Sequence, residues 1–284
     1  MGGKTFWITG AGTGYGRCIA LALAAAGSRV FLTGRRPEKL EETRAEAGRL
    51  GIDVVRCVPV PADIASPDSV QDAVGRIAQQ SDHLYGLVNN AALPQPPSGQ
   101  YPLGDLDADR WNRLLATNLT GQWVVTKAAL PLMSAGPALR ILFMSSQAGW
   151  AFTPGFGPYN ITKAATNNLG ASFAAECAVR FPGKDVQINV LVPGEAYTEM
   201  NQGSSESPYS VVSMALALLS HPAGGPNGCF FHRDGRHLAF AGASPYPTPL
   251  LAGETSAVME ADSSLSAARQ PGLRWLLQRL RRGP

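Results

Sequence analysis

The stretch TGAGTGYG, residues 9–16, decides the fold of this chain. It joins an apolar run, KTFWIT, to a helix-like run, RCIALALAAAG. Gly10, Gly14 and Gly16 permit a tight turn, close approach of the backbone to a pyrophosphate group, and close packing of a helix on a strand. The helix start after the turn offers free N–H groups and a positive dipole end to phosphate. The stretch therefore predicts a nucleotide-binding strand–turn–helix unit, with a merely tight turn as the alternative.

Strand-like and helix-like segments alternate along the chain from this turn onward. The strand-like segments are mostly continuous apolar runs, as expected when helices cover both faces of a sheet. Alternating β and α units imply a parallel sheet with right-handed crossovers. We predict a single-domain α/β fold, a doubly wound (Rossmann-type) parallel sheet of seven strands with helices on both faces. The expected strands are 4–9, 28–33, 54–60, 84–90, 140–146, 186–192 and 228–232, and the expected helices are 17–27, 37–51, 66–80, 107–133, 159–181 and 207–220.

The composition of the 284-residue chain argues against several classes of protein. Its hydrophobic fraction of 45% is that of a globular protein, and its net charge of +3 gives no argument for a nucleic-acid partner. Apolar runs stay well short of the ~20 residues of a membrane span, and the first ten residues lack the apolar segment of a secretion signal. The cysteines fit free thiols in a reducing compartment, so we expect a cytoplasmic protein; they are Cys18, Cys57, Cys177 and Cys229.

Polar motifs follow the expected strands in a definite order. Tyr159 and Lys163, in YNITK, share one helix face, which alone is a weak signal. They gain weight because Ser146 lies thirteen residues before Tyr159. After the glycine turn, the whole set is Asn89-Asn90-Ala91-Ala92, Asn118 in RLLATNLTG, Ser146 in MSSQAG, Tyr159 and Lys163, and Pro193-Gly194 with Thr198 in VPGEAYTEM.

Taken together over about residues 4–240, these motifs resemble the short-chain dehydrogenase/reductase family, in its compact single-domain branch. The resemblance implies an oxidoreductase that uses a nicotinamide cofactor. Three positions depart from the family pattern: Ala92 stands in place of Gly, Thr162 in place of the usual Ser before the lysine, and Arg236 in place of the second Gly of a DGG-like turn.

The resemblance implies a catalytic set of Asn118, Ser146, Tyr159 and Lys163. Tyr159 would exchange a proton with the substrate oxygen, because hydride transfer itself belongs to the nicotinamide. Tyrosine titrates near ~10, and we expect a nearby Lys163 cation to lower that pKa and to reach a ribose hydroxyl. Ser146, with Ser145 as its rival, would bond the substrate oxygen, and Asn118 would hold a water that links Lys163 to solvent. Taken singly, Asn118 could be a buried helix residue and Ser146 a strand-end cap.

The cofactor is predicted to be NADP (NADPH). The second expected strand ends at Gly34, where NAD-binding relatives carry an acidic residue, and two arginines follow. A guanidinium fork suits a 2′-phosphate, so Arg35 is the main expected contact and Arg36 the secondary one, with a solvated helix start as the alternative. The full set of expected cofactor contacts is Gly10, Thr13, Gly14, Tyr15, Gly16, Arg35, Arg36, Asp63, Ile64, Asn90, Ala91, Tyr159, Lys163, Pro193, Gly194 and Thr198.

Substrate contacts are expected from residues 201–210, from 93–97, and from an aromatic stretch. In that stretch we expect Ser146, Gln147, Trp150, Phe152, Phe156 and Tyr159 to face a mid-sized carbonyl compound. Packing alone is the alternative for the aromatic side chains. His232 and His237 lack a third ligand nearby, so no metal is predicted.

The predicted function is NADP-dependent interconversion of a carbonyl and a secondary alcohol on a small molecule. A non-catalytic NADP-binding regulatory protein, or an isomerase, dehydratase, or imine or ene reductase on the same fold, are the alternatives. The resemblance implies a homodimer or homotetramer through the helices at 107–133 and 158–181, with no membrane partner. Residues 1–242 form the expected catalytic domain, and 243–284 a Pro/Ser-rich extension with a possible short basic amphipathic helix. We expect this helix to dock on its own or a neighbouring subunit or to stay disordered, with binding to a membrane surface as the alternative.

Overall fold

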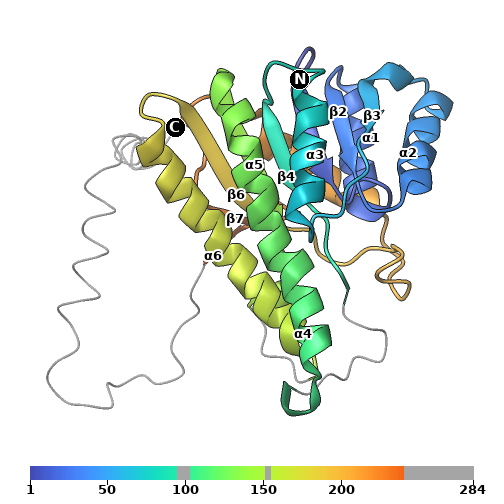
Figure 1. Ribbon diagram of the computed structural model, residues 1–284, viewed down its shortest axis with the longest axis vertical. Helices are drawn as coiled ribbons and strands as arrows, with labels where there is room; N and C mark the ends of the chain where they lie inside the picture. The colour runs from blue at the N-terminus through green and yellow to red at the C-terminus, as the bar shows by residue number, and fades with distance from the viewer. Residues whose placement is uncertain (95–102, 151–154, 240–284) are drawn as a thin grey trace, which may run out of the picture. The chain divides into compact units, whose positions relative to one another are not determined.

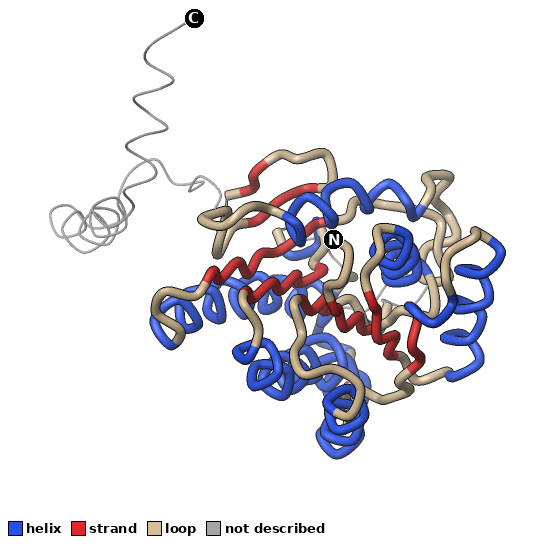
Figure 2. Tube along the Cα trace, turned by 90° about the horizontal axis from the view of Figure 1, so that it is seen from above, coloured by secondary structure: helices blue, strands red, loops and turns tan. Residues whose placement is uncertain are grey.

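An eight-stranded sheet forms the centre of the protein. The computed structural model describes residues 1–94, 103–150 and 155–239, and residues 1–240 make one compact unit. The strand order is β3-β2-β1-β4-β5-β6-β7-β8, and the strands form a layer between helices (Figures 1 and 2). The strands are β1 (Thr5–Thr9), β2 (Arg29–Thr33), β3 (Cys57–Pro59), β4 (Gly86–Asn89), β5 (Ala138–Met144), β6 (Asp185–Val192), β7 (Phe230–His232) and β8 (His237–Leu238).

The two faces of the sheet carry two separate hydrophobic cores. On β1, Phe6 and Ile8 enter the core under α1, α2 and α7, whereas Trp7 enters the core under α3, α5 and α6. This alternation follows from the two-residue period of a strand, and it explains why the strands read as continuous apolar runs. The helices are α1 (Gly14–Ala25), α2 (Pro37–Arg49), α3 (Pro67–Ala78), α4 (Ala108–Leu115), α5 (Gln122–Ala135), α6 (Gly157–Arg180) and α7 (Val212–Ser220).

The start of α3 shows how local sequence sets a helix boundary. Ser66 is the N-cap, and its hydroxyl accepts a hydrogen bond from the Ser69 N–H at 3.3 Å. Pro67 occupies the first helical position, where its missing N–H costs nothing. The helix predicted at 66–80 therefore begins where its sequence offers a cap. Of the helices in the described part of the chain, none is long and apolar enough to cross a bilayer.

Two expectations about the elements need correction. The sheet has eight strands rather than seven, because the chain turns back after β7 and pairs β8 antiparallel to it. The two-residue β8 is too short to show any periodicity in the sequence. The expected single helix at 107–133 is interrupted between α4 and α5 by a π-helical segment, Ala116–Gly121. Such π turns occur frequently at functional sites, and this one contains Asn118.

The β1–α1 turn brings three pieces of backbone unusually close together. Gly10 has φ of 66°, in the left-handed region that favours glycine. A Cβ on Gly16 would lie 2.2 Å from the Gly10 carbonyl oxygen and 2.5 Å from Nδ2 of Asn90. The Asn90 amide donates to the carbonyl oxygens of Thr9 and Gly10, at 3.0 and 3.1 Å. Asn90, which follows β4, therefore fixes the turn that follows β1.

Gly16→Ala should destabilise the fold, because the added methyl group meets backbone that cannot move aside. We expect a loss of roughly 1–3 kcal/mol in the free energy of unfolding, measured by urea denaturation. Gly75→Ala on α3 is the matched control, since a Cβ there meets nothing within 4 Å; it should be neutral or stabilising by up to about 1 kcal/mol. Equal stability of the two variants would show that the turn is not tightly packed.

Candidate active site

Tyr159 and Lys163 lie one turn apart near the start of α6. Lys163 is buried, with 3% of its surface exposed. Its ammonium nitrogen lies 5.6 Å from the centre of the Tyr159 ring and donates to the Met144 carbonyl oxygen, at the end of β5, at 3.0 Å. The sheet edge after β5 and the first turns of α6 therefore meet around this pair.

Burial dominates the electrostatics of the pair. Removal of water raises the pKa of Tyr159, and a hydrogen bond with Ser146 opposes that rise. The same desolvation lowers the pKa of Lys163 from its usual 10.5 to about 8. The expected lowering of the Tyr159 pKa by a lysine cation is therefore not what this structure shows. Tyr159 is a protonated phenol at neutral pH, beside an amine that changes charge near pH 8.

Ser146 and its neighbour Ser145 have different partners. The Ser146 hydroxyl lies near Tyr159, where it opposes the rise in the Tyr159 pKa, and it accepts a hydrogen bond from the Ala148 N–H at 3.2 Å. Ser145 is buried and donates to Oδ1 of Asn167 on α6 at 2.5 Å. The structure therefore places Ser146 at Tyr159, while Ser145 connects the end of β5 to the helix that carries Tyr159.

Asn167 is a residue that the sequence reasoning missed. It lies one turn after Lys163, has 1% of its surface exposed, and would clash with any side chain at Gly149. Its hydrogen bond with Ser145 holds α6 against the chain segment that contains Ser146. Tyr-x-x-x-Lys patterns do not extend to this position, so the only signal was a polar residue on the buried face of a helix.

Asn118 lies in the π segment and is completely buried. Its side-chain oxygen accepts from the Leu93 N–H at 2.7 Å, and its amide donates to the Leu93 carbonyl at 3.0 Å and to Thr162 Oγ1 at 3.4 Å. The Thr162 hydroxyl in turn donates to the Tyr159 carbonyl at 2.8 Å. Thr162, which stands where the family usually has Ser, thus joins Asn118 to the first turn of α6. The Asn118 backbone carbonyl accepts from Thr166 Oγ1 at 3.4 Å.

The start of α1 fits a dinucleotide phosphate. Thr13 is the N-cap, and within the described residues its side chain makes no capping hydrogen bond, so it leaves the first N–H groups of the helix uncapped. Gly14 lies against Thr198, with a built Cβ 3.2 Å from the Thr198 methyl carbon. The Tyr15 hydroxyl donates to the Gly194 carbonyl at 3.0 Å, and burial raises the pKa of Tyr15 to about 12. A phosphate would therefore meet a glycine turn, a helix N-terminus and the loop after β6.

The loop after β6 begins with Pro193 and Gly194 and closes on itself at Thr198. The Thr198 hydroxyl accepts from the Asn201 N–H at 3.1 Å, so this side chain fixes a short turn. After β4, the Asn90 and Ala91 N–H groups both donate to the Thr9 hydroxyl at 3.1 Å. Three loops, after β1, β4 and β6, thus come together at the carboxyl edge of the sheet.

The side of the site nearest β2 carries positive charge. Gly34 follows β2, and a Cβ there would make only an ordinary contact with Leu40, so the strand end offers neither a carboxylate nor a bulky group. Arg35 is exposed and, among the described residues, has no side-chain partner. Arg36 is the N-cap of α2 and pairs with Glu199 at 2.6 Å. This arrangement fits a 2′-phosphate better than a free 2′-hydroxyl.

Asp63 and Ile64 follow the third strand, as the resemblance requires. The Asp63 carboxylate accepts from the Ala65 N–H at 3.0 Å, which makes a local turn. Ile64 is buried against Gly121 of the π segment. The turn leaves the second carboxylate oxygen of Asp63 available to an adenine amino group.

The expected substrate side chains have different surroundings. Gln147 and Phe156 are exposed. Trp150 instead packs edge-to-face against Phe230, with ring centroids 5.9 Å apart, and its indole N–H donates to the Ala239 carbonyl at 2.7 Å. This is the packing alternative that the sequence left open for the aromatic residues. Phe152 and residues 95–97 lie outside the described residues.

The comparison with known proteins now decides the family. Residues 4–208 match the family model described as short chain dehydrogenase. This chain belongs to the short-chain dehydrogenase/reductase family. The resemblance inferred from its motifs is confirmed, and so is the fold.

Relatives and solved structures of this family cover most of the described chain. The 11-beta-hydroxysteroid dehydrogenase 1A of Arabidopsis thaliana is 34% identical over 201 residues, 71% of this chain and 54% of the relative, so the chain spans about half of that relative's length. Oxidoreductase UcpA of Escherichia coli K12 is 35% identical over 225 residues, 76% of this chain and 80% of the relative. A solved short chain dehydrogenase from Pseudomonas syringae is 25% identical with a TM-score of 0.75, covering 82% of this chain and 95% of that one.

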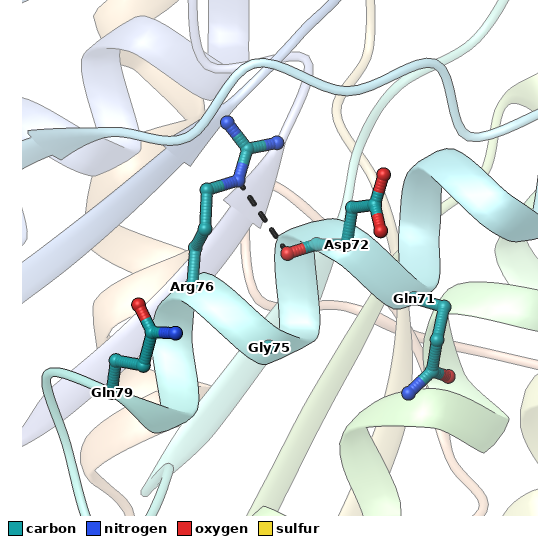
Figure 3. A pocket seen from close by; sticks show the side chains of 5 residues that line it. All are labelled: Gln71, Asp72, Gly75, Arg76 and Gln79. Carbon is teal, nitrogen blue, oxygen red and sulfur yellow. Dashed lines mark hydrogen bonds between the residues drawn. The ribbon is translucent and has the colours of Figure 1, made fainter.

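Other polar features of this family member lie away from the catalytic pair. His232 contacts the Asp234 carboxylate at 2.9 Å, and no group of three metal-binding side chains occurs in the described parts of the chain. A hollow on the outer face of α3 is formed by that helix alone, where Arg76 Nε donates to the Asp72 carbonyl at 3.4 Å (Figure 3). It touches none of the loops that build the site.

Lys163→Met should stabilise the protein at neutral pH, because the native state holds a buried ammonium group. The unfolded chain keeps this proton up to pH 10.5, whereas the folded chain releases it near 8. Wild-type stability should therefore rise with pH between these values. We expect the variant to be more stable by up to about 3 kcal/mol at pH 7 and the difference to shrink towards pH 10, in urea titrations at each pH.

Lys127→Met is the matched control, because Lys127 is exposed on α5. It should leave the pH dependence of unfolding unchanged. A constant difference between Lys163→Met and wild type across pH 7–10 would contradict the depressed pKa of Lys163.

Proposed function

We propose that the chain is an NADP-dependent oxidoreductase that interconverts a carbonyl and a secondary alcohol, and works as an NADPH-preferring ketoreductase. One observation carries the proposal: Ser146, which lies just after β5, is near enough to Tyr159 for its hydroxyl to oppose the rise in the Tyr159 pKa, and the buried Lys163 amine lies one helical turn away. The two neighbouring hydroxyl groups would each donate a hydrogen bond to the carbonyl oxygen of a bound substrate. We assign this activity to residues 1–242, with 243–284 as a separate extension.

Tyr159 would act as the general acid in reduction. Its raised pKa keeps the phenol protonated at neutral pH, which suits proton donation to an alkoxide better than proton removal from an alcohol. The Ser146 hydroxyl would hold the same oxygen and stabilise its developing charge. A bound nicotinamide supplies the hydride in this direction and accepts it in the reverse one. Oxidation by Tyr159 as a base would require higher pH.

Lys163 and Asn118 would assist Tyr159 in its role as proton donor. Lys163 would hold a ribose hydroxyl and, with a pKa of about 8, could gain and lose a proton near neutral pH. Asn118 would fix Leu93 beside the site through its two hydrogen bonds and connect Lys163 to solvent through a water. One relative is named as a hydroxysteroid dehydrogenase, and removal of hydrogen from a secondary alcohol gives a carbonyl.

The NADP preference rests on the chemistry at the end of β2. The strand end lacks a carboxylate for a 2′-hydroxyl, and the exposed Arg35 guanidinium is available to a phosphate. Gly10, Gly14 and the uncapped start of α1 would hold the pyrophosphate.

We also propose that the protein is a homodimer or homotetramer through α4, α5 and α6. The last two helices carry exposed apolar side chains: Trp123 is 43% exposed, Ile161 38% and Val179 83%. α4 and α6 pack against each other and run side by side (Figure 1). Large apolar side chains exposed on these helices suit a subunit interface. A monomer in analytical ultracentrifugation at micromolar concentration would contradict this assignment.

Tyr159→Phe should retain NADPH binding and lose turnover. Removal of the proton donor should lower kcat by roughly 10²–10⁴-fold, measured as NADPH oxidation with a panel of ketones and aldehydes. Tyr197→Phe removes a hydroxyl from an exposed tyrosine and should leave kcat unchanged. Equal turnover of Tyr159→Phe and wild type would rule out this mechanism, and NADPH binding without turnover in wild type would favour a regulatory protein.

Arg35→Ala should weaken NADP⁺ binding and leave NAD⁺ binding nearly unchanged. Loss of a charged hydrogen bond to phosphate corresponds to roughly 10- to 100-fold in Kd, measured by calorimetry at fixed salt. Arg49→Ala, at the far end of α2, is the control for a lost surface charge. The NADP assignment fails if wild type binds both cofactors equally and Arg35→Ala changes neither affinity.

A further inference from the structure

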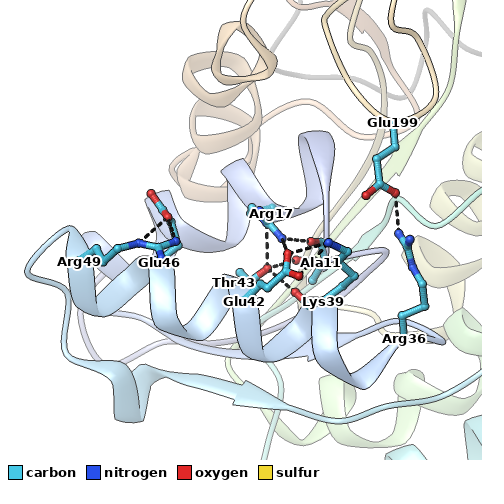
Figure 4. Close-up of polar contacts among 10 residues, drawn as sticks. Ala11, Arg17, Arg36, Lys39, Glu42, Thr43, Glu46, Arg49 and Glu199 are labelled. Atoms are coloured by element: carbon cyan, nitrogen blue, oxygen red, sulfur yellow. Dashed lines mark hydrogen bonds and ion pairs between the residues drawn. The ribbon is translucent and has the colours of Figure 1, made fainter.

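Arg36 and Glu199 form an ion pair between two segments that flank the glycine turn. Arg36 Nη2 lies 2.6 Å from Glu199 Oε2, although the residues are 163 positions apart in the chain. Figure 4 shows Arg36 reaching from the start of α2 to Glu199. The side chains are 52% and 51% exposed, so water and dissolved anions reach both partners.

The two segments that carry the pair both contact the glycine turn of the proposed cofactor site. Within the turn, a Cβ on Gly12 would meet Lys39 of α2 at 2.9 Å, and one on Gly14 would meet Thr198 at 3.2 Å. Arg36 and Glu199 are the neighbours of these contact points: Arg36 starts α2, and Glu199 directly follows Thr198. The ion pair therefore connects the ribose side of the site to the loop after β6.

A carboxylate and a phosphate use the same guanidinium donors. One guanidinium nitrogen of Arg36 donates a charge-assisted hydrogen bond to Glu199. A 2′-phosphate would accept hydrogen bonds of the same kind from Arg36. An exposed ion pair is weak enough to be displaced, and it corresponds to roughly a 1.5- to 5-fold change in an equilibrium constant. A dianionic phosphate that takes Arg36 would also repel the carboxylate beside it.

We propose that Glu199 is an internal competitor for the cofactor 2′-phosphate and so sets the preference between NADP and NAD. This inference rests on the proposed function. Glu199 occupies Arg36 in the free protein and opposes the phosphate in the loaded one. NAD⁺ carries a hydroxyl at the same position and leaves the pair intact. The exchange of partners also releases Glu199, and with it the loop after Thr198, only when NADP is bound.

The test compares Glu199→Gln with Glu195→Gln by calorimetric titration with NADP⁺, NAD⁺ and 2′,5′-ADP at one salt concentration. Both changes remove one negative charge from the same exposed loop, but only Glu199 pairs with Arg36. Glu199→Gln should bind NADP⁺ and 2′,5′-ADP roughly 2- to 5-fold more tightly and leave the Kd for NAD⁺ within about 1.5-fold of wild type. Glu195→Gln should shift all three ligands little and equally.

A double-mutant cycle tests whether the effect of Glu199→Gln on NADP⁺ binding depends on Arg36. In an Arg36→Ala background, the same Glu199→Gln change should no longer tighten NADP⁺ binding, because the contested partner is gone. The competitor role is overturned if Glu199→Gln and Glu195→Gln shift NADP⁺ equally, if NAD⁺ tightens as much as NADP⁺, or if NADP⁺ binding weakens. A wild-type protein that binds neither cofactor overturns the proposed function itself, which the wild-type titration shows separately.

Discussion

The contact of Asn90 with Gly10 and Gly16 is the constraint on which the rest of the site depends. β1 and β4 are neighbours in the sheet, and the strand order reverses there, so their ends form the crevice where doubly wound folds bind ligands. The Asn90 amide ties the ends of β1 and β4 together. No methyl group fits on Gly10 or Gly16 between these segments. This restricts the conformation of the turn and fixes the position at which α1 begins.

Burial is the second physical theme of the site. Lys163 is buried and Tyr159 is half-buried, and desolvation favours the uncharged form of each: a phenol with a raised pKa and an amine with a lowered one. Keeping a lysine in such a place lowers stability, which is a common price of function. A buried hydrogen bond from Ser145 to Asn167 joins the end of β5 to α6, and the Thr162 hydroxyl donates to the Tyr159 carbonyl within that helix. Packing around Tyr159 thus influences the pKa of this proton donor as much as neighbouring charge does.

The sequence was sufficient for the fold and for proposing a catalytic set, but not for the surroundings of that set. The glycine turn, the apolar runs and the Ser66 cap act locally, so their pattern predicts structure directly. Thr162 was left without a role, because its hydrogen bond to Asn118 spans 44 positions. The two-residue β8 and the π segment depend on tertiary packing and leave no periodic signal. The Tyr159 pKa was expected to fall, since a sequence shows the charge of a lysine but not its burial.

The most direct test of the central claim is deuterium transfer to substrate. The protein would be incubated with NADPH carrying deuterium at both C4 positions and a panel of ketones and aldehydes, and the products analysed by mass spectrometry and NMR. The account predicts an alcohol with one deuterium on the former carbonyl carbon. Products without deuterium at that carbon, or no alcohol from any carbonyl compound despite NADPH binding, would contradict it.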